Sequence, residues 1–258
     1  MGKQVSGGAH TSRTMLLNDL MSVLAACPAR ASIGDYRTAI MEQNVAGKDT
    51  QSSRQRTFRY LRELYRLDLD DALFRAFLRL WARDPQGRPQ IAILMAVTND
   101  KALAATSPGV LSAAPGSPVT SEQLAAAVDR EFPGSYADAI RAKIGRNALS
   151  SWTQAGYLQR SGPRSPALRQ SVDPSPGAVA MALLLGEADG MSGERLFNSR
   201  YTALLDASSA TLHDRAHEAA RKGWLGYQSR GAVTEVDLDA LVAAPDDGRL
   251  PAMSGACA

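Results

Sequence analysis

Apolar residues recur at helical spacing along most of the first hundred positions of the chain. The spacing predicts five helices joined by short turns, over residues 15–26, 35–44, 50–67, 70–81 and 89–106. Connections this short favour helix packed directly on helix. The sequence therefore predicts a helical N-terminal domain over residues 13–112, preceded by a flexible tail over residues 1–12.

The next part of the chain combines helices with short extended segments. Proline and glycine concentrate between residues 107 and 118, which predicts a linker. Thr120 and Gln123 have the spacing of a capping box and begin a helix, and a basic helix follows it. Residues 157–172 then turn back around Gly162-Pro163, as a β wing does. This order predicts a winged-helix-like domain over residues 119–190.

The C-terminal part repeats the combination of a helix with a two-stranded ribbon. After an apolar helix that begins at Pro176, the pattern predicts a helix over 209–222 and strands over 224–228 and 233–236. We assign residues 191–242 to this unit and residues 243–258 to a disordered tail. The predicted fold is mainly α, with winged helix-turn-helix parts and short β wings.

A first concentration of positive charge lies between residues 136 and 172, where six basic residues face one acidic residue. On a helical wheel, Ile140, Ile144, Ala148, Leu149 and Trp152 form an apolar half of the basic helix. A basic and amide-bearing front on such a helix suits phosphates and base edges of a major groove. The candidate DNA-binding residues on the helix and in the wing are Lys143, Arg146, Asn147, Ser150, Arg160 and Arg164.

A second basic segment spans residues 45–66, with six positive and two negative charges. Phe58, Leu61, Leu64 and Tyr65 share its apolar arc, and Asp49 or Thr50 is the expected N-cap. The candidate DNA-binding residues here are Arg54, Arg56, Arg59, Arg62 and Arg66. The alternative is that these arginines cover neighbouring helices with their stems and pair with carboxylates such as Glu63.

Net charge supports a localised anionic partner. The whole chain carries +3, yet the two basic segments together carry nine positive charges in excess. Such asymmetry favours nucleic acid over a small acidic ligand. Two distant cysteines and apolar runs too short for a bilayer predict a cytoplasmic protein without membrane contact.

Signals for catalysis are weak in this sequence. Motifs of nucleotide binding and acyl transfer do not occur, so we expect no cofactor and no enzymatic activity. His213 and His217 have the i, i+4 spacing of metal ligands, but no third ligand is evident and we expect no metal site. Asp68, Asp70 and Asp71 could hold Mg²⁺ for phosphodiester cleavage, although helix N-capping explains them better.

In its order of segments the chain resembles the BrxA proteins of bacteriophage-exclusion (BREX) defence systems. The resemblance covers residues 11–240 and rests on SRTMLLNDL, YRTAIMEQNVAGKDTQSSRQRTFRYLRELYRLD, IGRNALSSWTQAGYL, PGAVAMALLLGEADGMSGERLF and ARKGWLGYQSRGAVTEV. It implies a helical bundle similar to NusB-type RNA-binding domains, with winged-helix parts and double-stranded DNA binding. It also implies an accessory role beside methyltransferase, ATPase and phosphatase-like defence proteins.

The sequence thus predicts a non-enzymatic protein that binds duplex DNA and serves phage defence. A stand-alone winged-helix transcriptional regulator and an RNA-binding helical-bundle protein are the alternatives. A palindromic operator would favour the first alternative, and preference for structured RNA would favour the second.

Overall fold

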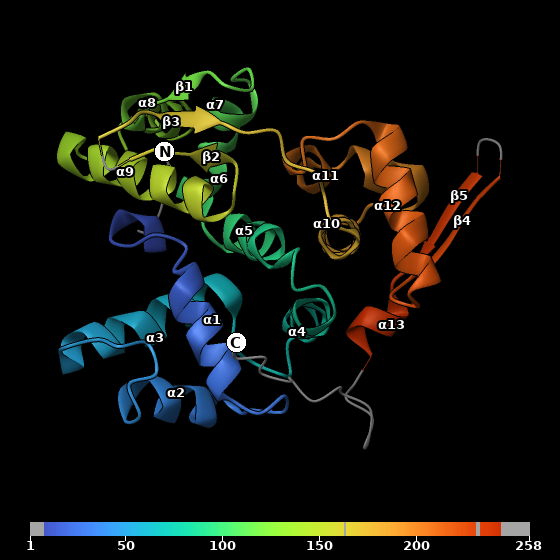
Figure 1. Cartoon of the computed structure of the whole chain (residues 1–258), viewed down its shortest axis with the longest axis horizontal. Helices are drawn as coiled ribbons and strands as arrows, with labels where there is room; N and C mark the ends of the chain where they lie inside the picture. Colours follow the sequence, from blue (N-terminus) through green and yellow to red (C-terminus); the bar gives the residue numbers. More distant parts are fainter. Residues whose placement is uncertain (1–7, 163, 231–232, 244–258) are drawn as a thin grey trace.

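The computed structural model describes residues 8–162, 164–230 and 233–243, and helices dominate them (Figure 1). The N-terminal elements are η1 (Ala9–Thr11), α1 (Leu17–Ala26), α2 (Ile33–Met41), α3 (Gln51–Tyr65), α4 (Ala72–Arg83), α5 (Arg88–Asn99), α6 (Lys101–Ala105) and α7 (Ser107–Leu111). The next are β1 (Pro118–Val119), α8 (Ser121–Glu131), α9 (Asp138–Gln154), β2 (Leu158–Gln159), β3 (Ala167–Arg169) and α10 (Pro176–Ala188). The last are η2 (Gly193–Asn198), α11 (Arg200–Leu204), α12 (Ser209–Arg221), β4 (Gly226–Arg230), β5 (Val233–Asp237) and α13 (Asp239–Val242). The predicted mainly α fold is confirmed.

Two helices that are apolar on all sides form the centre of the molecule. In α5 the residues from Gln90 to Val97 are all buried, and in α10 those from Gly177 to Gly186 are all buried. A helix without a polar face must be surrounded by other elements. Accordingly, α10 contacts α4, α5, α11 and α12. One cluster of buried residues extends from Ala9 to Leu241, so the N-terminal and C-terminal helices share a core.

The prediction of one continuous helix over residues 89–106 is wrong. Asp100 has an extended backbone that ends α5, and its side chain accepts a hydrogen bond from Leu103 N at the start of α6. The predicted linker over 107–118 is also partly helical, because Pro108 fits the first turn of α7. Helix periodicity alone does not reveal that Asp100, between Asn99 and Lys101, ends one helix and caps the next.

Caps at several helix starts follow the sequence prediction. The Thr120 hydroxyl accepts from Gln123 N while the Gln123 side chain accepts from Thr120 N, so the capping box of α8 is present. Thr50 caps α3, and Asp71 caps α4 by accepting from Phe74 N. The acidic group at residues 68–71 therefore includes a helix cap, as expected.

Two small antiparallel sheets are present in the described part of the chain. In the first, β3 lies between β1 and β2, with Pro118 opposite Leu168 and Leu158 opposite Arg169. In the second, β4 pairs with β5 along five residues, so the predicted ribbon after α12 is confirmed with its first strand shifted by two residues. Pro163 and Gly231, predicted in the two turns, lie outside the described residues.

The flexible tail predicted over residues 1–12 is wrong for residues 8–12. Residues 9–11 form η1, which packs against α9, and both Ala9 and His10 are buried. Figure 1 shows this short helix between α9 and α1, on the side where α3 also lies. Residues 1–7 and the predicted tail from 244 to 258 lie outside the described residues.

Candidate nucleic-acid interface

A groove between α2 and α3 carries the clearest concentration of arginine. Its volume is about 790 Å³, and Ile33, Met41 and Phe58 supply apolar lining. Four guanidinium-bearing side chains line it, those of Arg37, Arg56, Arg59 and Arg62. Three of the four belong to the predicted α3 set, whereas the sequence analysis missed Arg37 on the polar side of α2.

The charges in this groove are poorly compensated. Arg59 approaches Glu63 at 3.6 Å and donates to the Tyr60 hydroxyl at 2.6 Å. Among the described residues, the side chains of Arg37, Arg56 and Arg62 have no ion pair and no hydrogen bond. Guanidinium groups that converge without carboxylate partners repel one another and favour an anion between them. The α2–α3 groove is therefore a candidate anion-binding surface.

Two predicted arginines of this segment have structural roles instead. Arg54 donates to the backbone oxygens of Met41 and Lys48 and so holds the turn between α2 and α3. Arg66 follows the end of α3 with a φ of 75°, pairs with Asp71 at 2.6 Å and donates to Asn99. Their guanidinium groups are already engaged by the protein, which favours a structural role over DNA binding for these two arginines.

The second basic surface lies on α9 and on the loop between β2 and β3. Lys143, Arg146 and Ser150 of α9 are exposed, as are Arg160 and Arg164 of the loop. Arg141 is instead half-buried and bridges Asp129 and Asp138, each at 2.7 Å. Of the six residues predicted here, the structure thus leaves five accessible to a ligand, and the sixth is Asn147.

The predicted apolar and polar halves of α9 need two corrections. Ile140, assigned to the apolar half, is 43 % exposed, because it lies in the first turn beyond the packed part of the helix. Asn147, assigned to DNA binding, donates from Nδ2 to the His10 backbone oxygen at 2.8 Å. Ile144, Ala148, Leu149 and Trp152 are buried as predicted.

The N-terminal segment covers one side of α9. Besides Asn147, the Ser151 hydroxyl accepts from Met15 N at 2.8 Å, and the Gln154 side chain accepts from Leu17 N at 3.0 Å. Amide side chains are the groups that read adenine edges in a major groove. On α9 the Asn147 and Gln154 side chains already bind the protein's own backbone, so the exposed face is mainly cationic.

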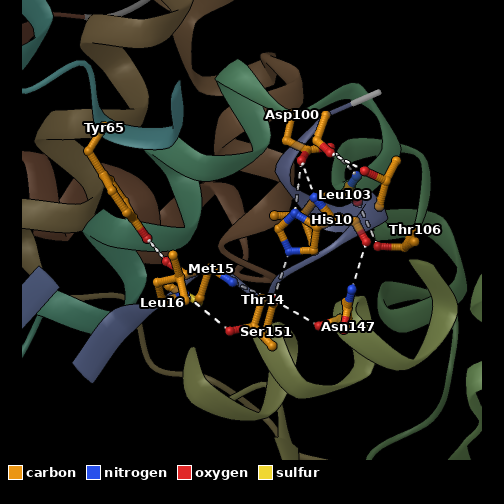
Figure 2. Close-up of polar contacts among 12 residues, drawn as sticks. His10, Thr14, Met15, Leu16, Tyr65, Asp100, Leu103, Thr106, Asn147 and Ser151 are labelled. Atoms are coloured by element: carbon orange, nitrogen blue, oxygen red, sulfur yellow. Dashed lines mark hydrogen bonds and ion pairs between the residues drawn. The ribbon is translucent and has the colours of Figure 1, made fainter. Parts of the chain in front are cut away.

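His10 forms the centre of a buried polar network (Figure 2). Its Nδ1 lies 2.9 Å from Asp100 Oδ2, and its Nε2 lies 2.8 Å from Ser151 Oγ. The backbone N–H of His10 also donates to Asp100 Oδ2 at 2.8 Å. This network ties η1 to the start of α6 and to α9.

The His10 network has the order of a Ser–His–Asp triad but not its chemistry. His10 and Ser151 are 0 % exposed and Asp100 is 1 % exposed, so no substrate reaches the hydroxyl. The Ser151 hydroxyl accepts from Met15 N and donates to Asn147 O, which leaves no free position for attack. Burial by itself would raise the pKa of Asp100, but hydrogen bonds and charge from His10 lower it below its usual value. The network is a structural tie.

No local pattern in the sequence predicts this tie, because its members are far apart along the chain. His10 and Asp100 are separated by 90 positions, and His10 and Ser151 by 141. A lone histidine in a Gly- and Ser-containing leader gives no local signal of burial. Arg169, one of the six basic residues between 136 and 172, is likewise buried by contacts from afar and pairs with Asp206.

His213 does not present free metal-binding nitrogens. Its Nδ1 is 2.7 Å from the Tyr227 hydroxyl, its Nε2 is 3.2 Å from Glu194 Oε1, and its ring stacks on Phe197. Across residues 8–162, 164–230 and 233–243, no group of three or more His, Cys, Asp or Glu side chains is arranged to hold a metal ion. In the same part of the chain, no helix has the length and apolar character of a bilayer-spanning segment.

Comparison with known proteins gives no further guide to this surface. No protein-family model matches the chain, and none of the curated proteins searched matches it. The geometry and charge of the two basic surfaces are therefore the guide to function.

Proposed function

We propose that this protein binds double-stranded DNA through the α2–α3 groove and the exposed face of α9. The observation that carries the proposal is the set of uncompensated cations in the groove, Arg37, Arg56 and Arg62. Duplex DNA presents about one negative charge per 1.7 Å of helix axis and suits an extended cationic surface. Lys143, Arg146, Arg160 and Arg164 add four exposed positive charges on α9 and its adjoining loop.

The order of elements around α9 supports a winged helix-turn-helix assignment. Helices α6 and α7, strand β1, helices α8 and α9, and strands β2 and β3 follow one another, and the three strands form one antiparallel sheet. In winged helix-turn-helix proteins, the second helix of the pair enters the major groove. In this proposed arrangement α9 enters the major groove, and Arg160 and Arg164 contact flanking phosphates.

We expect little sequence preference from this interface. Phosphate contacts position a protein on a duplex, whereas base contacts specify sequence. Arginine and lysine dominate the exposed candidates, and the Asn147 amide is engaged by His10 O. This favours a general duplex-binding protein over a stand-alone operator-specific regulator.

The resemblance to BrxA proteins adds a cellular role to the proposal. It places the protein in the cytoplasm as a non-enzymatic accessory of a phage-defence system, beside methyltransferase, ATPase and phosphatase-like partners. The NusB-like character of the helical bundle belongs to the same proposal. Disruption of the gene in a host with a functional system should abolish or weaken phage exclusion if this role is correct.

A salt titration tests the DNA-binding proposal directly. With roughly six phosphate contacts, the affinity for a labelled 24-bp duplex should fall about a thousandfold between 50 and 200 mM salt. Fluorescence anisotropy measures this, and structured RNA serves as competitor in a second titration. A flat salt response, or stronger competition by RNA than by unlabelled duplex, would reject duplex DNA as the partner.

A further inference from the structure

Helices α3 and α9 are fastened to the same residue of the N-terminal segment. The Tyr65 hydroxyl of α3 donates to the Met15 backbone oxygen at 2.6 Å, and the Met15 N–H donates to Ser151 Oγ of α9 at 2.8 Å (Figure 2). The backbone N and O of one residue are at most about 3.6 Å apart, so the two side-chain hydroxyls lie within about 9 Å of each other. Met15 is fully buried, so this junction lies inside the protein.

From this junction both helices lead to basic residues. At a rise of 1.5 Å per residue, Lys143 lies about 12 Å along α9 from Ser151, and Arg56 lies about 14 Å along α3 from Tyr65. In both cases the basic residue is on the N-terminal side of the junction. Figure 1 shows the two helices beginning at the same side of the molecule, with η1 between them. The two cationic surfaces are therefore linked through one buried junction and lie on helices that begin at the same side of the molecule.

We propose that a single duplex contacts both surfaces at once, with Met15 and the His10 network setting their separation. This inference rests on the proposed DNA-binding function and specifies how the two surfaces share their ligand. The path from Lys143 through the junction to Arg56 is about 35 Å long, a length that one 16-bp duplex spans. Two separate duplexes at this distance would repel each other, whereas one duplex gains from both sets of contacts.

The junction matters because the gain in DNA affinity from two linked surfaces depends on a fixed distance between them. His10, bound by Asp100 and Ser151, holds η1 against α9, and Tyr65 holds Met15 against α3. Because buried hydrogen bonds hold both helices to the N-terminal segment, we expect little conformational entropy to be lost when DNA binds. A looser junction would keep each cationic surface intact but weaken the binding of one duplex to both surfaces together.

Stoichiometry and salt dependence together test the shared duplex. The variants are Arg56→Ala with Arg62→Ala, Lys143→Ala with Arg146→Ala, and all four changes combined, each titrated with a fluorescein-labelled 16-bp duplex. We expect one duplex per chain by analytical ultracentrifugation. Each pair of changes should lower the log–log salt slope by about 1.8, and the combination by about 3.6.

Three other results have distinct meanings. Two duplexes per chain, or a pair of changes that leaves the salt slope unaltered, would overturn the shared-duplex proposal while duplex binding itself stands. Absence of salt-dependent binding by the unmodified chain would instead reject the proposed function. Circular dichroism melts on the same variants identify any that fail to fold, and such a variant is replaced by Arg→Gln or Lys→Gln at the same positions.

A matched pair of tyrosine variants tests the role of the junction. Tyr65→Phe removes the bond to Met15 O, and Tyr157→Phe removes an equally buried bond of 2.8 Å to Leu204 O in α11. Both should lower stability to a similar extent, but only Tyr65→Phe should weaken binding to the 16-bp duplex, by about threefold or more. Equal affinities for the two variants would overturn the role assigned to the Met15 junction.

Discussion

At the scale of single residues, His10 makes three buried hydrogen-bond contacts that fasten the N-terminal segment to the rest of the protein. It bonds Asp100 through both its ring and its backbone, and its second ring nitrogen contacts Ser151. A buried carboxylate that loses its partner keeps its desolvation cost without compensation. Breaking these hydrogen bonds should therefore lower the stability of the protein strongly. We expect the buried groups to take no part in catalysis.

His10→Ala should lower the free energy of unfolding by about 3–5 kcal/mol, because it leaves the Asp100 carboxylate buried and unpaired. Urea denaturation followed by circular dichroism measures the change. His217→Ala, at an exposed position of α12, is the control and should stay within about 0.5 kcal/mol. A small effect of both substitutions would show that η1 contributes little to stability.

Acid should weaken the same tie. The pKa of Asp100 is lowered in the folded chain relative to the ordinary aspartate value, so its contribution to stability is present above that value and is lost as pH falls through the lowered pKa. Asp100→Asn should remove this part of the acid dependence. Midpoints of urea denaturation at several pH values below about 4 would test it, and an unchanged slope against pH would contradict it.

At the scale of elements, α9 divides into a packed side and an exposed cationic side. Ile144 and Trp152 are fully buried, and the Trp152 indole donates to the Thr106 hydroxyl at 2.8 Å. Lys143 and Arg146 point away from this core and remain exposed. Folding and ligand binding by this helix should therefore be separable by substitution.

Ile144→Ala and Trp152→Ala should each destabilise the protein by about 2–5 kcal/mol through cavity formation. Lys143→Ala with Arg146→Ala should change stability by no more than about 0.5 kcal/mol per site. Thermal melts give both values, and Ile140→Ala, at an exposed apolar position of the same helix, is the matched control for loss of a large side chain. A large loss of stability in Ile140→Ala would contradict the exposure of this side chain in the structure.

At the scale of the whole molecule, the two basic surfaces are joined through one core and one buried segment. The Ser151 hydroxyl is buried, and both nitrogens of His213 are engaged. Direct assays of nuclease and ATPase activity decide whether the protein is an enzyme.

Supercoiled plasmid should remain uncut when the protein is added with Mg²⁺, Mn²⁺ or ATP, and ATP should not be hydrolysed. Asp71 is occupied as the cap of α4 and as the partner of Arg66, so it is poorly placed to hold a catalytic ion. Agarose gels and phosphate release measure the two activities. Cleavage that disappears in Asp70→Ala with Asp71→Ala would contradict the prediction.

Much of the architecture could be predicted from local patterns. Helices α1 to α4, the capping box of α8, the buried helix α10 and the β4–β5 ribbon each depend on residues close together in the sequence. Periodicity, caps and turn residues act over a few positions, so the sequence displays them directly. The exposed cations of α3 and α9 follow from the same periodicity.

Only the tertiary structure decided which polar side chains are free. Arg54, Arg66, Asn147 and Arg169 look like their exposed neighbours in the sequence, yet each is engaged by a partner that the fold brings near. The sequence by itself determined most of the longer helices and the segments in which charge accumulates. The fold alone determined the burial of His10 and the junction of α3 and α9 at Met15, because contacts between positions 10, 100 and 151 are set by packing and leave no local trace.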